Sequence, residues 1–188
     1  HRGASGSEEN TGDGAGILIQ LPHSFLRQKM KEKGRSLPQK GNYGAGMVYL
    51  SQNEDKRKEI KNIIEEIIKA ENQKVIGWRK VPVNTAGIGE SALEIMPDFY
   101  QIFIEKSEEI EQGIEFERKL YLIRKRIENK IRNSEYEGEL YFASLSSRTL
   151  VYKGMLTPEQ LEKFFPDLNE PEFKTAIALV HSRFSTNT

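Results

Sequence analysis

The chain has 188 residues, of which 37% are hydrophobic and 30% charged, and its 28 basic residues balance its 28 acidic ones. This length supports one domain with a substantial core, or two small domains. The balanced charge excludes strong global attraction to nucleic acid or to an acidic membrane surface. The chain contains no cysteine, so it supplies no disulfide, thiolate metal ligand or thiol nucleophile. No apolar run reaches the roughly 18 residues of a transmembrane helix, and we expect a cytoplasmic protein.

The first half of the chain predicts strands and helices in turn. Pro22 suits the first position of a helix that Gly34 ends, and a glycine-bearing loop is expected over residues 84–91. Residues 54–71 predict an amphipathic helix, because isoleucines recur there at helical spacing. These isoleucines are Ile60, Ile63, Ile64, Ile67 and Ile68. The expected strands cover about residues 16–21, 44–51, 75–81 and 99–106.

The second half begins with a long helix and a pair of strands. The helix covers about residues 114–133 and has one apolar face. Residues 140–146 and 149–153 have the pattern of a hairpin that turns at Ser147-Arg148.

The last part of the chain predicts a short helix and a strand. Thr157-Pro158-Glu159-Gln160 has the form of a capping box with proline at the first helical position. Residues 175–181 are almost continuously apolar, which is typical of a central strand buried on both faces. The mixture of elements favours an α+β domain with a mainly antiparallel sheet. We expect one domain over residues 1–188, with a charged insertion at about 51–136.

The glycine-rich opening, His1-Arg2-Gly3-Ala4 and then Thr11-Gly12-Asp13-Gly14-Ala15-Gly16, is the most unusual motif. It runs into a strand and lacks a Gly-Lys-Ser/Thr sequence, which argues against a phosphate-binding P-loop. Two interpretations stay open. The glycines form a structural turn, or they form a loop that closes over a small anionic or zwitterionic ligand.

The second motif, His181-Ser182-Arg183-Phe184-Ser185-Thr186-Asn187, follows the last predicted strand. An arginine at such a position suits carboxylate recognition, because the guanidinium donates two parallel hydrogen bonds. The alternative is an ordinary surface arginine.

Other candidate sites have weaker support. The three histidines, His1, His23 and His181, lack the spacing of metal ligands. The basic helix 114–133 also carries glutamates, and its pattern favours a solvated face over a nucleic-acid interface.

The two motifs together, in this order, resemble the glutamate synthase large-chain family. Pro22-His23, Val81-Pro82-Val83, Leu140–Thr149 and Tyr152–Leu156 are similar to the same family, so the resemblance runs end to end. It implies a class II glutamine amidotransferase domain of the N-terminal nucleophile hydrolase fold. That fold is a four-layer α/β/β/α sandwich of antiparallel sheets, here expected to be incomplete at both ends. The segment 51–136 matches less distinctively and resembles an insertion found in glutamate synthases.

The resemblance also implies a chemistry. In the family an N-terminal cysteine attacks the side-chain amide of L-glutamine, ammonia leaves, and water releases glutamate from a thioester. The ammonia then serves reductive glutamate synthesis from 2-oxoglutarate. Arg2 matches a supporting arginine near the nucleophile, Arg183 the arginine that holds the substrate α-carboxylate, and Thr186 a position that contacts the same ligand region. Asp13 and Gly14 lie in the nearby loop and receive no chemical role.

The nucleophile and the oxyanion-hole segment are not among the 188 residues. Both ends have the appearance of internal positions, so we expect an internal fragment that is inactive by itself. No cofactor is expected here, whereas the family implies FMN and an iron–sulfur cluster in other domains. It also implies the remaining domains of the parent chain and a small electron-supplying subunit or ferredoxin as partners. The alternatives are a non-catalytic amino-acid-binding module and a protein-interaction module built on helices 54–71 and 114–133.

Overall fold

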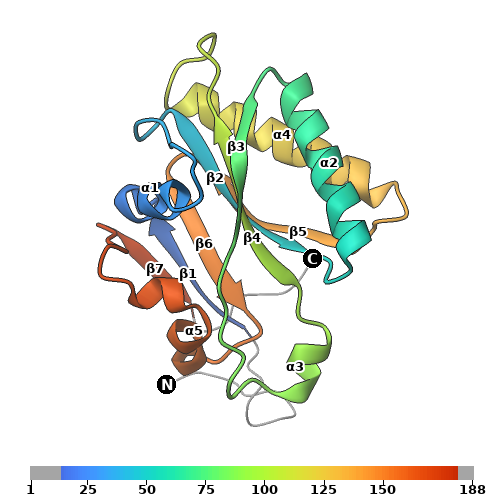
Figure 1. Ribbon diagram of the computed structural model, residues 1–188, viewed down its shortest axis with the longest axis vertical. Coiled ribbons are helices and arrows are strands. Elements are labelled where there is room, and N and C mark those ends of the chain that lie inside the picture. Colours follow the sequence, from blue (N-terminus) through green and yellow to red (C-terminus); the bar gives the residue numbers. More distant parts are fainter. Residues whose placement is uncertain (1–13, 182–188) are drawn as a thin grey trace.

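The protein is described by a computed structural model over residues 14–181, apart from the side chain of Ser91 (Figure 1). Strands and helices are interleaved along the chain. The elements in order are β1 (Ala15–Gln20), α1 (His23–Lys31), β2 (Tyr43–Leu50), α2 (Glu54–Ala70), β3 (Lys74–Lys80), α3 (Glu90–Glu94), β4 (Asp98–Glu105), α4 (Ile114–Arg132), β5 (Leu140–Ser146), β6 (Thr149–Gly154), α5 (Pro158–Phe164), the 3-10 helix η1 (Pro166–Asn169) and β7 (Ala178–His181).

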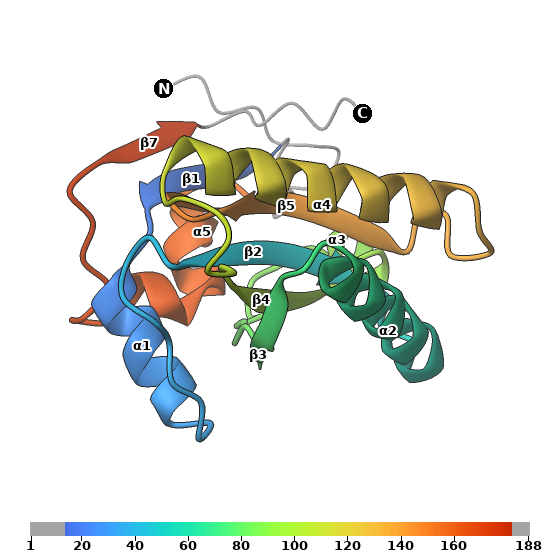
Figure 2. The same cartoon turned by 90° about the horizontal axis from the view of Figure 1, so that it is seen from above.

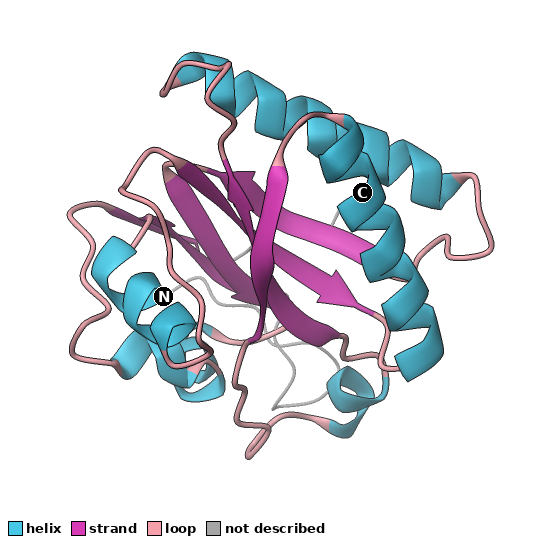
Figure 3. Ribbon diagram, turned by 45° about the horizontal axis from the view of Figure 1, so that its top comes forward, coloured by secondary structure: helices cyan, strands magenta, loops and turns pink. Residues whose placement is uncertain are grey.

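The strands form two sheets, one of three strands in the order β6-β1-β7 and one of four strands in the order β3-β4-β2-β5 (Figure 3). Every strand pair in both sheets is antiparallel. The expected α+β class with antiparallel sheets is therefore confirmed.

The core between the two sheets is built by side chains that alternate along the strands. Tyr43, Ala45 and Met47 of β2 point into it, as do Leu150 and Tyr152 of β6. The helices α1 and α5 add apolar side chains to the same core. Because successive strand residues point to opposite faces, the other face of β2 is left for a second core.

The second core lies between the four-stranded sheet and the pair α2 and α4. Ile60, Ile64 and Ile68 of α2 are fully buried there, and Ile63 and Ile67 are partly buried at its edge. The helical spacing of these isoleucines thus predicted the buried face correctly. Figure 3 shows both helices against the four-stranded sheet.

Two helix ends agree with the features predicted from the sequence, one after α1 and one at the start of α5. Gly34 has a φ of +68° just beyond α1, a conformation that glycine adopts without strain. Thr157 and Gln160 form the predicted capping box at α5, in which the Thr157 amide donates to Gln160 Oε1 at 2.8 Å. Two short helices, α3 and η1, were not predicted; α3 begins inside the expected loop 84–91.

The hairpin prediction for β5 and β6 is wrong in its pairing, although the strand bounds are right. β5 pairs with β2 in the four-stranded sheet, and β6 pairs with β1 in the three-stranded sheet. Ser146 Oγ accepts the amides of Arg148 and Thr149, which holds the chain where it crosses between sheets. Strand patterns indicate where strands lie but not which sheet receives each one.

The prediction of a buried central strand near the end of the chain is also wrong for β7. β1 is the central strand, and within residues 14–181 β7 pairs with β1 alone (Figure 2). Leu179 and Val180 are each 64% exposed. A continuous apolar run therefore does not by itself establish burial on both faces.

The segment 51–136 contributes β3 and β4 to the same sheet as β2 and β5. It is integrated with the rest of the fold, and its origin as an insertion stays a prediction. None of the helices within the described residues is long and apolar enough to cross a membrane.

Candidate functional site

The described ends of the two sequence motifs lie at one end of the three-stranded sheet. In the antiparallel register Gly16 of β1 lies opposite His181 of β7, and Ala15 lies opposite Gly154 of β6. The chain therefore enters β1 and leaves β7 at the same end of the sheet. Gly16 and His181, which are more than 160 positions apart in the sequence, are therefore neighbours in the sheet. A ligand site shared by the two motifs requires such an arrangement.

The residues proposed from the sequence to hold substrate are Arg183 and Thr186, and the proposed supporting arginine is Arg2. All three lie outside the described residues, as does Asp13. Their roles stay predictions. Gly14 lies within the described residues. It is buried, and its backbone φ is +121°, a value that residues other than glycine rarely adopt. This favours a specific backbone shape at the entry to β1, although it assigns Gly14 no chemical role.

A tyrosine from the other sheet fixes this end of the three-stranded sheet. Tyr49 Oη of β2 donates a 2.6 Å hydrogen bond to the Lys153 carbonyl oxygen near the end of β6. Burial raises the pKa of the Tyr49 phenol above its ordinary value, so the hydroxyl stays protonated and keeps donating. The bond ties β6, which neighbours the start of β1, to the four-stranded sheet.

A buried polar cluster contacts β6 at Tyr152, the residue before Lys153. Arg79 of β3 and Asp167 of η1 form a two-armed ion pair with N–O distances of 2.6 and 2.7 Å. Tyr152 Oη donates to Asp167 Oδ2 at 2.9 Å and accepts from Gln101 Nε2 at 2.9 Å. Burial, followed by the nearby Asp167 carboxylate, raises the Tyr152 pKa, so this hydroxyl also stays protonated.

The cluster was not predicted from the sequence. Asp167 and Arg79 are 88 positions apart, and nothing local links them. A signal was nevertheless present, since Arg79 precedes the buried Val81 by two residues on an expected strand. A charged residue on the core-facing side of a strand indicates a buried partner elsewhere.

Histidine does not form a metal centre in the described part of the chain. His23 Nδ1 lies 3.1 Å from the Tyr43 hydroxyl, at the start of α1. Residues 14–181 contain no group of three or more His, Cys, Asp or Glu side chains arranged to hold a metal ion.

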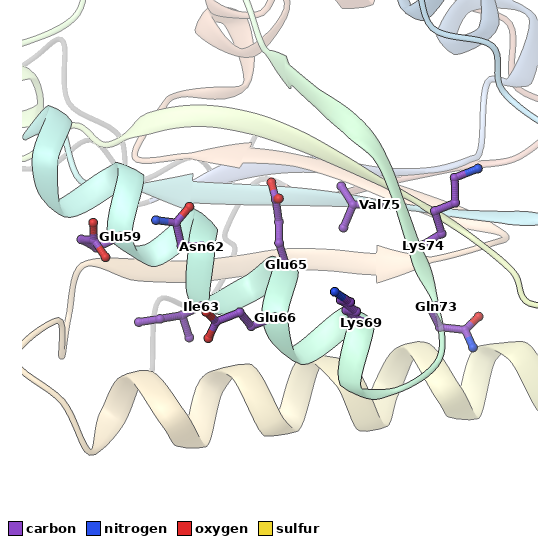
Figure 4. A pocket seen from close by; sticks show the side chains of 9 residues that line it. All are labelled: Glu59, Asn62, Ile63, Glu65, Glu66, Lys69, Gln73, Lys74 and Val75. Atoms are coloured by element: carbon purple, nitrogen blue, oxygen red, sulfur yellow. The ribbon is translucent and has the colours of Figure 1, made fainter.

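Two of the described cavities lie away from the motif-bearing end of the sheet. One, of about 480 Å³, is lined by Gln20, Thr149 and Ile177 at the opposite end of the three-stranded sheet. A groove of about 680 Å³ lies between α2 and the start of β3 and has Glu59, Glu65 and Glu66 along its helix side (Figure 4). Neither cavity contains a residue proposed from the sequence to hold substrate.

The amino-acid sequence matches the family described as Glutamine amidotransferases class-II over residues 1–188. The chain is 52% identical over 189 residues to the Glutamate synthase [NADPH] large chain of Bacillus subtilis. It is 39% identical to the ferredoxin-dependent glutamate synthase of Oryza sativa and 40% identical to the Glutamate synthase [NADH] of Saccharomyces cerevisiae.

Each of these matches covers 100% of this chain, but only 12%, 12% and 9% of the three relatives. The chain therefore spans a small part of the length of the curated relatives it matches. The resemblance drawn from the two motifs is confirmed by matches that run end to end. By its sequence and its α+β sandwich of antiparallel sheets, the chain belongs to the class-II glutamine amidotransferase family, whose fold is that of the N-terminal nucleophile hydrolases.

Proposed function

We propose that this chain forms the substrate-holding part of the glutamine-hydrolysing domain of a glutamate synthase. The whole enzyme hydrolyses L-glutamine to glutamate and ammonia, and the ammonia is used for reductive glutamate synthesis from 2-oxoglutarate in the cytoplasm. Support comes from the names of the relatives, which are all glutamate synthases. The observation that carries the proposal is the Gly16–His181 register, which attaches both motifs to one end of a sheet.

In this proposal the two motifs divide the work of binding glutamine. Arg183 holds the α-carboxylate of glutamine with two hydrogen bonds, Thr186 contacts the same region, and Arg2 supports the nucleophile's end of the site. The nucleophile is a cysteine, and the 188 residues contain none. The isolated chain accordingly binds glutamine without hydrolysing it.

In this proposal the redox groups of the whole enzyme belong to regions outside this chain. An iron–sulfur cluster needs thiolate ligands, and this chain supplies none. The proposal places the cluster, and with it FMN, in the synthase domains of the whole enzyme. Its electron donor is a reduced nicotinamide-dependent subunit or ferredoxin. The names of the relatives include NADPH-, NADH- and ferredoxin-dependent forms.

The proposal is tested by a chimera. The 188-residue chain replaces the matching segment of the Bacillus subtilis large chain, and glutamine-dependent glutamate formation is measured. The chimera is expected to be active. Arg183→Ala should raise the KM for glutamine about 10- to 100-fold, because a hydrogen bond to a charged group contributes about 1.5–3 kcal/mol. Arg148→Ala, at an exposed position in the chain crossing, is the matched control and should leave the KM unchanged.

Two results would contradict the proposal. One is a folded chimera without glutaminase activity, with circular dichroism showing native structure. The other is an unchanged KM in the Arg183→Ala chimera. For the isolated chain, ammonia release from glutamine above background would refute the assignment of the nucleophile to another part of the enzyme.

A further inference from the structure

The two helices that cover the four-stranded sheet form one layer on the surface of the protein. α2 and α4 pack against the same core, and Glu71 at the end of α2 forms salt bridges with Lys119 and Arg126 of α4 (Figure 3). Each helix buries one face in that core, so its opposite face is directed away from the sheet. The outward faces of the two helices therefore belong to one continuous surface.

The outward face of α2 carries a stripe of negative charge. Its members are all exposed and recur at the i, i+4, i+7 and i+11 positions of the helix, namely Asp55, Glu59, Asn62 and Glu66 (Figure 4 shows the last three). None of the three carboxylates has an ion-pair partner among residues 14–181. Glu65 lies outside the stripe and accepts a 2.7 Å hydrogen bond from Trp78 Nε1 of β3. Lys58 and Lys69, seven and four positions from Glu65, lie on that same side of the helix, so they are separated from the stripe.

The outward face of α4 combines positive charge with apolar side chains. Its exposed members again follow helical spacing, namely Arg118, Tyr121, Leu122, Lys125, Asn129 and Arg132. Three of these six residues are cationic and none is acidic. Tyr121 is 62% and Leu122 44% exposed, although α4 buries its other apolar side chains on the face toward the sheet. Within the described part of the chain, Arg118 and Arg132 have no carboxylate partner.

The two stripes are complementary in charge, and a second copy of the chain can match both of them at once. A two-fold axis in the plane of the helix layer places α2 of each copy over α4 of the other, so the acidic and basic stripes meet twice. Tyr121 and Leu122 are covered in the same contact, which adds apolar burial. α2 has 17 residues, and a layer about 25 Å long and two helices, about 20 Å, wide is of the order of the roughly 800 Å² that each partner buries in a standard interface.

We propose that the layer formed by α2 and α4 is a self-association surface, through which two copies of this chain form a two-fold symmetric dimer. The acidic stripe of α2 in one copy binds the basic stripe of α4 in the other. Nucleic acid fits this layer less well, because its phosphates meet the carboxylates of the α2 stripe and leave Leu122 uncovered. The surface contains no residue of the proposed glutamine site, so the inference is independent of the proposed function.

The test is sedimentation equilibrium of the purified 188-residue chain. Its molecular mass is expected to rise with concentration from 21.6 kDa toward twice that value. The dissociation constant should be on the order of 10 µM, at the weak end of the range for interfaces of this area. Raising the NaCl concentration from about 0.05 to about 0.5 M should weaken the dimer at least about fivefold, because exposed charge pairs are screened by salt.

Charge reversal on each stripe tests the pairing directly. Arg118→Glu with Arg132→Glu should raise the dissociation constant at least about tenfold, because like charges then face each other across the interface. Glu59→Lys with Glu66→Lys should have the same effect for the same reason. The variant that carries all four changes exchanges the charges of the two stripes. Its dissociation constant should return to within about threefold of the original value, since the paired positions are coupled.

The matched control is Lys31→Glu with Lys33→Glu, which makes the same change in net charge at exposed positions near the end of α1. It should leave the dissociation constant unchanged, and an equal loss of affinity in this control would contradict the pairing of stripes. Circular dichroism establishes that each variant is folded. A chain that stays monomeric at a concentration on the order of 100 µM would overturn the proposal. So would a dimer that either reversal leaves intact, a fourfold variant that stays dissociated, or a monomer that binds polyuridylate instead.

Discussion

Arg79 and Asp167 form a two-armed ion pair whose side chains are only 5% and 1% exposed. Both carboxylate oxygens are used, and Tyr152 and Gln101 complete the hydrogen bonding of the cluster. The described residues contain no buried side-chain nitrogen or oxygen without a hydrogen-bond partner. The pair therefore joins β3 to η1 through the core in a fully satisfied network.

Breaking this pair is expected to be costly. Arg79→Met should lower the free energy of unfolding by about 3–5 kcal/mol, because it leaves the Asp167 carboxylate buried without its partner. Urea unfolding at pH 7 measures the change. Lys74→Met is the control, since Lys74 and Glu105 form an exposed pair that contributes about 0–1 kcal/mol. A double variant, Arg79→Met with Asp167→Leu, should lose less than the sum of the single variants; an additive loss would contradict the coupling.

A small residue is required where β2 passes under α4. A Cβ atom at Gly44 would lie 2.6 Å from Leu120 Cδ1, and Leu120 is fully buried. Gly44→Ala should therefore destabilise the protein by about 1–3 kcal/mol through overpacking. Thermal and urea unfolding of Gly77→Ala supplies the comparison, since its added Cβ would meet Met30 Cε at an ordinary 3.5 Å. The double variant Gly44→Ala with Leu120→Ala should lose less free energy of unfolding than the sum of the two single variants, because the shorter side chain at position 120 leaves room for the added Cβ.

His23 makes stability depend on pH. Burial lowers the pKa of His23 below its usual 6.5, and the charges of Arg27 and Lys40 lower it further. The unfolded chain thus binds more protons than the folded chain, so stability falls as pH drops below about 6.5 and the loss is complete below the folded pKa. Titration of the imidazole by NMR should give a midpoint below 6.5. His23→Gln, which keeps an acceptor for Tyr43, should flatten the dependence of stability on pH between 7.5 and 5; an unchanged slope would reject this assignment.

Glu117 of α4 holds the crossing from β5 to β6. Its carboxylate accepts from Ser146 Oγ at 2.9 Å and from both the amide and the hydroxyl of Ser147 at 2.6 Å. Glu117→Ala should lower the free energy of unfolding by about 1–3 kcal/mol, since the nearly buried Ser147 loses charged hydrogen bonds. Glu109→Ala, at an exposed loop position, should change it by less than about 0.5 kcal/mol. Hydrogen exchange at the Ser147 amide is expected to accelerate in the first variant alone.

Local patterns predicted the elements of this fold well and their partners poorly. The isoleucine spacing of α2 and the capping box of α5 depend on residues within one or two turns, so they can be recognised in a single sequence. The placement of β5 and β6 in different sheets depends on pairings with β2 and β1, which no local pattern contains. β7 was misjudged for the same reason, because its apolar side chains do not reveal that β1 holds the central position.

For the candidate site, too, the sequence patterns predicted some features and not others. The two motifs identified the family, and the register of β1 with β7 explains why they belong together. Arg2, Arg183 and Thr186 lie outside the described residues, so their roles rest on the resemblance.

The central place of β1 has a consequence for how the chain folds. Gln20, at the end of β1, bonds to Thr175 across 155 residues, and both strands beside β1 come from the last quarter of the chain. Such a high contact order slows folding, because a long loop must close before these pairings form. During synthesis β1 therefore emerges early and waits with both edges unpaired, which makes it the segment most exposed to aggregation or to binding by chaperones.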